Sequence, residues 1–178
     1  MWFGHLETLP AVEHPELLGA PVAAAIAAVP GALVFAIDPA LAETEVLCAT
    51  LDLPLSCSAN AVLVTGRREG VKRNACCMTL AHRRVDVNGV VRRRLDVRKA
   101  SFAPMDEAVR ESGMEYGGIT PIGLPPEWPV WVDGAVADTE WVCIGSGIRA
   151  SKLIVPGAAL AQLPGAARID GLARDVPA

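Results

Sequence analysis

The chain has 178 residues, a length typical of one domain, and 52% of them are apolar while 20% are charged. This composition excludes a largely disordered chain, because there are enough apolar side chains to form a core. The five cysteines, at positions 48, 57, 76, 77 and 143, form no CxxC pair. Their odd number favours the reducing cytoplasm over a disulfide framework.

The net charge of −4 hides a basic block in an otherwise acidic chain. Residues 67–99 hold eleven of the sixteen basic residues and three acidic ones, whereas residues 1–66 hold no Lys or Arg. Such a block favours a surface that binds a polyanion such as nucleic acid. Solvated edge strands or a charged helix face give the same pattern, so charge alone leaves both interpretations open.

The first part of the chain predicts buried elements and no membrane span. Residues 17–37 carry no charge, but Pro21 and Pro30-Gly31 interrupt them and no basic residue flanks them. We therefore expect a helix over residues 15–29 and a strand over residues 33–37.

The middle of the chain predicts a helix and a hairpin. Asp38 as N-cap and Pro39 as the first helical residue begin a helix that ends near residue 51. Strands over residues 58–65 and 71–80 flank a glycine-bounded turn. Residues 86–95 remain ambiguous, because Asn88-Gly89 favours a hairpin while the spacing of valines and arginines suits an amphipathic helix.

The last part alternates short elements. We expect a helix over residues 104–112 that Gly113 ends, and a loop over residues 117–129. Strands follow at residues 130–132, 141–144 and 151–155, then a short helix at residues 156–163, and residues after about 172 are expected to be frayed. Without repeats or linkers, the pattern indicates one α+β domain over residues 1–178.

The usual signatures of catalysis are missing: the sequence has no HExxH, P-loop, GxSxG or metal-spaced Cys/His cluster. We therefore expect no metal and no cofactor. Two glycine-rich loops remain, residues 117–123 and residues 145–149. Glycines allow a backbone to approach a ligand and direct its N–H groups at a developing oxyanion, although plain tight turns are rich in glycine too.

The loop Gly117-Gly-Ile-Thr-Pro-Ile-Gly123 resembles the GGxxPxG loop of the YbaK/ProX family of aminoacyl-tRNA deacylases, which includes the editing domain of bacterial prolyl-tRNA synthetases. An A-x-x-x-x-G-M helix precedes it, and a V-x-V-D strand and a GSG turn follow it, as in that family. The resemblance covers a core of about residues 15–170. It implies a central mixed, mostly antiparallel β-sheet flanked by helices, with a helix at residues 87–95.

The resemblance also implies a trans-editing hydrolase that removes a wrongly attached small amino acid from tRNA by ester hydrolysis. A water molecule, helped by a ribose hydroxyl of the tRNA, would attack the ester carbonyl. The residues expected to act in catalysis are Asn60, Gly117, Gly118, Ile119, Thr120 and Pro121. Those expected to bind the substrate are Gly145, Ser146, Gly147 and Arg149.

Asn60 departs from the family pattern, because many members carry a lysine at the start of the corresponding strand. Asparagine donates and accepts hydrogen bonds but brings no charge that could offset a phosphate. Lys99 and Lys152 are the candidates for a compensating cation. Asn60 as a purely structural polar group of a strand is the competing interpretation.

The expected partner is mischarged tRNA, with no membrane and no DNA. The basic residues expected to bind tRNA are Arg67, Arg68, Lys72, Arg73, Arg92, Arg93, Arg94, Arg98 and Lys99. The alternative function is a non-catalytic module of the same fold that binds tRNA or an aminoacyl ligand, and a small-molecule hydrolase or binder is a third possibility.

Overall fold

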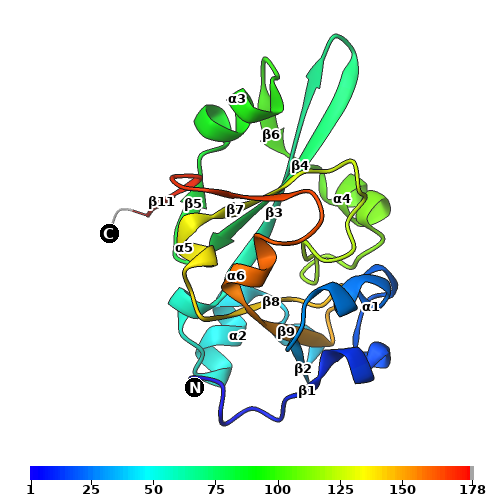
Figure 1. Cartoon of the computed structure of the whole chain (residues 1–178), viewed down its shortest axis with the longest axis vertical. Coiled ribbons are helices and arrows are strands. Elements are labelled where there is room, and N and C mark those ends of the chain that lie inside the picture. The colour runs from blue at the N-terminus through cyan, green and yellow to red at the C-terminus, as the bar shows by residue number, and fades with distance from the viewer. Residues whose placement is uncertain (177–178) are drawn as a thin grey trace.

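The computed structural model describes residues 1–176 and divides most strands between two sheets (Figure 1). The first sheet has the order β1-β2-β9-β8, with all pairs antiparallel. Its strands are β1 (Leu9–Pro10), β2 (Leu33–Ala36), β8 (Trp141–Gly145) and β9 (Ser151–Pro156).

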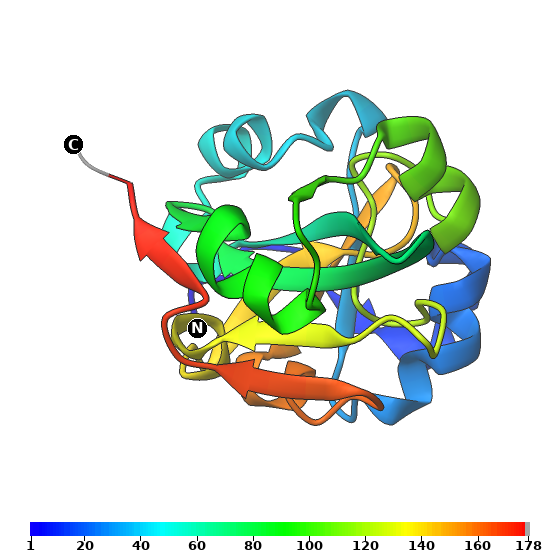
Figure 2. The same ribbon diagram turned by 90° about the horizontal axis from the view of Figure 1, so that it is seen from above.

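The second sheet has the order β10-β7-β4-β3-β6. Its strands are β3 (Ala59–Arg68), β4 (Val71–Leu80), β6 (Ala100–Phe102), β7 (Val130–Asp133) and β10 (Ala166–Ile169). Strand β7 runs parallel to both neighbours, β4 and β10, and Figure 2 shows β7 and β10 side by side. A small third sheet pairs β5 (Arg83–Val85) with β11 (Ala173–Asp175).

The helices are short and cover the sheets. The α-helices are α1 (Ala20–Ala25), α2 (Thr44–Leu51), α3 (Arg92–Leu95), α4 (Met105–Ser112), α5 (Gly134–Ala137) and α6 (Gly157–Leu160). A π-helix spans Val87–Val91, and 3-10 turns span Ala11–Glu13, Pro15–Leu17, Ile26–Ala28, Pro39–Leu41 and Leu55–Cys57.

Strand alternation divides the apolar side chains among three clusters. Leu63 and Cys76 point into the main cluster, which also contains Leu153 of the first sheet. Their neighbours Val64 and Cys77 point to the opposite face, where the helical residues 87–95 cover them. Because successive side chains of a strand point to opposite faces, both faces of each main sheet are buried.

The α+β class and the mostly antiparallel pairing are confirmed, as are the hairpin, α4 with Gly113 as its left-handed C-cap, and the later strands. The strands form two main sheets rather than one. Residues 87–95 are helical, as the resemblance implied, with Asp86 accepting hydrogen bonds from Gly89 and Val90 at the start.

Three local predictions were wrong. Residues 15–29 form three short helical pieces, because the N–H of Gly19 donates to Ser146 and its backbone packs against Gly147. The helix expected from Pro39 stops at Leu41 and restarts at Thr44. The segment after residue 172, expected to be frayed, forms β11 up to Asp175; residues 177–178 lie outside the described part.

No helix within residues 1–176 is both long and apolar enough to cross a bilayer. The uncharged run at residues 17–37 instead supplies α1 and β2.

Candidate active site

A cavity of about 400 Å³ opens where the two main sheets meet the start of α2. It is lined by residues 42–47, residues 58–61, the loop residues Tyr116, Gly117 and Ile119, residues 143–145, and Lys152. The walls therefore come from five separate segments of the chain. The cavity mixes polar donors and acceptors with apolar side chains, as ligand sites commonly do.

Asn60 lies at the start of β3 and lines this cavity. Its side-chain oxygen accepts a hydrogen bond of 2.7 Å from the Thr44 hydroxyl. This contact orients the amide, and its NH₂ group has no protein partner within residues 1–176. The arrangement leaves a hydrogen-bond donor for a ligand in the cavity.

The predicted glycine loop contributes two of its five expected residues to the cavity, Gly117 and Ile119. Gly117 has a φ of +82°, a left-handed conformation that favours glycine. The N–H of Gly118 donates to Glu115, and its carbonyl accepts from Gly147 at 2.7 Å, so Gly118 joins the two glycine loops.

Thr120 and Pro121 lie behind the loop and do not line the cavity. Thr120 is fully buried, and its hydroxyl has no partner among residues 1–176. These two residues therefore support the loop from the protein side.

The second glycine turn is mainly a packing device. Gly145 lines the cavity, whereas Ser146 is fully buried and hydrogen-bonds Ser151 through its hydroxyl at 2.8 Å. Gly147 packs against Gly19. Arg149 lies at the edge of the loop and donates to the carbonyls of Tyr116 at 3.0 Å and Pro39 at 3.1 Å.

Of the two candidate cations, Lys152 lines the cavity and Lys99 does not. Lys152 is 5% exposed, and its ammonium donates to the carbonyls of Ala42 at 2.8 Å and Gly117 at 2.9 Å. Burial lowers the pKa of Lys152 from its ordinary value, and the nearby charge of Arg149 lowers it further. Lys99 instead lines a separate groove beside β6.

The cavity holds no reactive thiol. Cys143 lines it, but burial raises the pKa of this thiol to about 12. Burial likewise raises the pKa of neighbouring Cys48. Because the thiolate is the nucleophilic form, burial makes both thiols weaker nucleophiles than an exposed cysteine. Within residues 1–176, no three His, Cys, Asp or Glu side chains gather as a metal site would require.

Six of the nine basic residues expected to bind tRNA line one or both of two grooves beside the second sheet. Arg67, Lys72, Arg98 and Lys99 line one groove, which includes the exposed Phe102. Lys72, Arg73 and Arg94 line the other, beside Trp128 and Trp131. Arg68, Arg92 and Arg93 line neither groove.

Several of these cations already have partners. Lys72 contacts Glu107 at 2.5 Å and Glu111 at 2.6 Å, and these hydrogen bonds raise its pKa. Arg68 and Arg73 both pair with Asp96 at 3.2 Å. The surface formed by the basic block is thus less positive than its sequence indicates.

The structure also brings residues into the cavity that the sequence did not single out. Thr44, Glu43, Glu45 and Tyr116 line it beside Asn60. Helix α2 lies far from the glycine loops in sequence, so no motif connected them. The sequence predicted a helix over this segment but contained no signal that connects it with the glycine loops.

Comparison with known proteins gives one family match and several structural ones. The model of the aminoacyl-tRNA editing domain matches residues 38–163, which includes every cavity segment. No curated protein matches the chain. The structure resembles that of a hypothetical protein with a TM-score of 0.69 and 18% identity, covering 79% of this chain and 90% of that one.

Two further solved structures are similar. A putative trans-editing enzyme for prolyl tRNA synthetase has a TM-score of 0.65 at 17% identity, with 77% of this chain and 83% of that one covered. A putative signal transduction protein from Marinobacter aquaeolei VT8 has a TM-score of 0.53 at 22% identity, and the match covers 94% of this chain and 31% of that one. At these identities the likeness establishes the fold.

Proposed function

The chain belongs to the aminoacyl-tRNA editing domain family, and from this premise we propose that it removes a wrongly attached small amino acid from tRNA by ester hydrolysis. One observation carries the proposal: the cavity presents hydrogen-bond donors beside a glycine loop and contains no ionised thiol. Such a site suits attack by water on a carbonyl that the protein polarises, rather than attack by a protein nucleophile.

The residues around the cavity suit an aminoacyl ester. Asn60 and the loop residues Gly117 and Ile119, which line the cavity, would contact the ester group. Glu43 and Glu45 offer carboxylates to the cationic α-amino group of the amino acid. Apolar walls such as Ile144 would select by size, since a pocket of limited volume discriminates among side chains mainly by excluding larger ones.

We propose that the two basic grooves contact the tRNA backbone. The exposed Phe102 beside Arg98 and Lys99 supports this assignment, because aromatic side chains stack on unpaired bases while cations track phosphates. The five free cysteines are consistent with action in the reducing cytoplasm.

The test uses tRNAs charged with Ala, Ser, Cys or Thr and follows release of the amino acid. We expect the wild-type protein to deacylate at least one of them. Asn60→Ala should lower turnover, and Thr44→Val should lower it less, because it removes only the contact that orients Asn60. In the Asn60→Ala background, Thr44→Val should have no further effect. A panel that stays fully charged at high protein concentration would exclude the hydrolase.

The alternative is a non-catalytic module that binds aminoacyl-tRNA. The neutral Asn60, where the resemblance places a lysine, favours this alternative. The two functions differ in one result: the module would bind mischarged tRNA and protect the ester instead of cleaving it.

A further inference from the structure

Lys152 is a buried cation without a carboxylate partner. It is 5% exposed, and none of the ion pairs within residues 1–176 includes it. Taking a charge out of water costs free energy unless an opposite charge compensates it. A buried ammonium that remains uncompensated beside a cavity is therefore a candidate for a functional group.

Lys152 does have a local task. Its ammonium donates to Ala42 on one wall and to Gly117 on the other, while Arg149 joins Pro39 to Tyr116 in the same two segments. Two cations, three positions apart, thus tie residues 39–42 to residues 116–117. Arg149 forms this link at the more exposed edge, and Lys152 forms it inside.

The two carbonyls do not occupy all of the N–H donors of the Lys152 ammonium. A lysine has three N–H donors, and Lys152 spends two on Ala42 and Gly117. The third has no acceptor within the described residues, although Lys152 lines the cavity. Lys152 is therefore a charged donor among the residues that line the cavity, fixed by two hydrogen bonds, with one N–H left for a ligand.

We propose that Lys152 is a catalytic residue that donates its third N–H to the ester carbonyl oxygen as this oxygen becomes negative. This inference rests on the proposed hydrolysis. Water adds to the carbonyl carbon, and the resulting oxyanion accepts the hydrogen bond from Lys152. The bond from that carbon to the ribose oxygen then breaks. The ribose oxygen takes up the proton lost by the water, and the amino acid is released while Lys152 keeps all of its protons.

The test uses 3′-O-alanyl-adenosine as a minimal substrate and its non-hydrolysable amide analogue as a binding probe. Lys152→Met should lower kcat about a hundredfold, the typical effect of losing one oxyanion donor. The KM and the Kd of the analogue should change less than about threefold, because the donor acts mainly in the transition state. Arg84→Met, which removes an exposed cation of β5 outside the cavity, is the control and should leave kcat unchanged.

The variant Lys152→Gln distinguishes a catalytic role of Lys152 from a purely structural role in connecting the two walls. Glutamine keeps two N–H donors for the two wall carbonyls but lacks the charge and the third proton. We expect this variant to keep the wild-type Tm and the wild-type Kd for the analogue while showing the same loss of kcat as Lys152→Met. If the glutamine variant keeps kcat within about threefold of wild type, Lys152 only connects the two walls of the cavity, and the inference is overturned.

The two proposals fail differently. Wild-type protein that binds the analogue but cleaves no ester would overturn the hydrolase, and the role of Lys152 with it. Wild-type protein that cleaves the ester while both Lys152 variants cleave it equally well would overturn the role of Lys152 alone.

Discussion

At the scale of single residues, the candidate site depends on how closely two glycine loops approach each other. A Cβ at Gly118 would lie 2.5 Å from the carbonyl oxygen of Ile148, a backbone atom that cannot move aside cheaply. A Cβ at Gly117 would lie 2.8 Å from the guanidinium of Arg149, the end of a flexible side chain. Gly118 therefore serves packing, whereas Gly117 serves the geometry of the cavity wall.

Gly117→Ala should lower both stability and activity. The left-handed φ costs alanine about 1 kcal/mol, and the new methyl group displaces Arg149 from the wall. Gly31→Ala is the matched control, because Gly31 has a φ of +79° but no atom within 4 Å of the added Cβ. Urea unfolding should show a loss of stability in both variants, the larger one in Gly117→Ala, whereas deacylation should fall only in Gly117→Ala. Equal activities would mean that the Arg149 contact is unimportant.

The buried charge of Lys152 predicts a specific dependence of stability on pH. Its pKa in the folded protein is lowered from the ordinary value of 10.5, mainly by burial, with Arg149 acting in the same direction and Glu43 and Cys143 opposing it. The charged form is thus disfavoured by folding. The resulting cost is full below the folded pKa and disappears as the pH rises toward 10.5.

Wild type should therefore gain stability relative to Lys152→Met between neutral pH and about pH 10.5, the unfolded value. Urea unfolding of both proteins at several pH values measures this difference, and other titrating groups cancel because the two proteins share them. Parallel stability curves would show that Lys152 has the same pKa in the folded and unfolded states.

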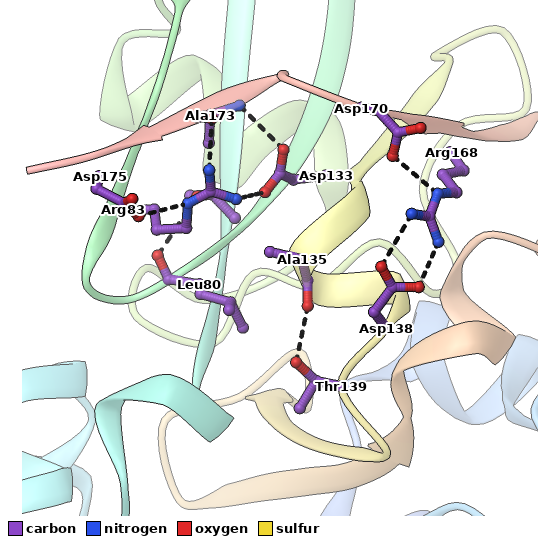
Figure 3. A network of polar contacts seen from close by, with 11 residues as sticks. Leu80, Arg83, Asp133, Ala135, Asp138, Thr139, Arg168, Asp170, Ala173 and Asp175 are labelled. Atoms are coloured by element: carbon purple, nitrogen blue, oxygen red, sulfur yellow. Dashed lines mark hydrogen bonds and ion pairs between the residues drawn. The ribbon is translucent and has the colours of Figure 1, made fainter.

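At the scale of elements, one buried network fastens the third sheet to the second (Figure 3). Asp133, fully buried at the end of β7, accepts hydrogen bonds from the Arg83 guanidinium of β5 and from the N–H of Ala173 at 3.1 Å. Arg83 also donates to the carbonyl of Ala173 and to Asp175. These contacts explain why residues 173–175 form a strand instead of fraying.

Asp133→Ala should lower the free energy of unfolding by about 3–5 kcal/mol, because it leaves the mostly buried Arg83 without its main partner. Asp138→Ala is the control, since Asp138 forms an equally direct but exposed pair with Arg168. We expect no measurable change there, as solvent screens the pair. Denaturant unfolding measures the free energy of unfolding of both variants. Equal losses of stability would contradict the conclusion that the buried Asp133 contacts fasten the third sheet.

Local sequence patterns correctly predicted those helices and strands whose turn or cap residues lie within a few positions of the element. The β3–β4 hairpin follows from two apolar runs around Gly70, and α4 ends at Gly113, where its left-handed cap requires glycine. Patterns failed where distant contacts decided. The helix over residues 15–29 breaks at Gly19 because of Gly147, and Lys152 reaches Ala42 across 110 positions.

The same reasoning explains the mixed outcome at the site. The glycine loop and Asn60 were found because they form or flank a compact motif, and Gly117, Ile119, Gly145 and Asn60 do line one cavity. Thr44 and Tyr116 were missed because only the fold brings them there. The sequence left Lys99 and Lys152 as candidates for the compensating cation. The structure distinguishes them, because Lys152 lines the cavity and Lys99 lines a separate groove.

At the scale of the whole molecule, the long hairpin connects the cavity with one of the basic grooves. Asn60 stands at its base and Arg67 near its tip, about 23 Å apart at roughly 3.3 Å per residue. Figure 1 shows the tip extending beyond the rest of the second sheet. The proposal that a tRNA end occupies the cavity therefore predicts that the tRNA backbone runs along the hairpin toward this groove.

Binding of tRNA should weaken steeply as salt increases. Arg98→Gln and Lys99→Gln should each reduce the slope of log affinity against log salt by roughly one unit, the loss of one phosphate contact. Arg84→Gln, an exposed arginine outside both grooves, should leave the slope unchanged. Hydrolysis of the minimal adenosine ester should be unaffected in all three. An unaltered slope in both groove variants would argue against the groove as a tRNA surface.

The position of β9 between β2 and β8 has a consequence for the order in which the protein can assemble. During synthesis β2 can pair with β1 along one edge, yet its other edge has no partner until residues 151–156 have been made. The walls at residues 39–61 must likewise wait for Lys152. Contacts this distant in sequence form slowly and leave strand edges exposed in the meantime. We therefore expect the growing chain to stay without a working cavity until β9 has been synthesised.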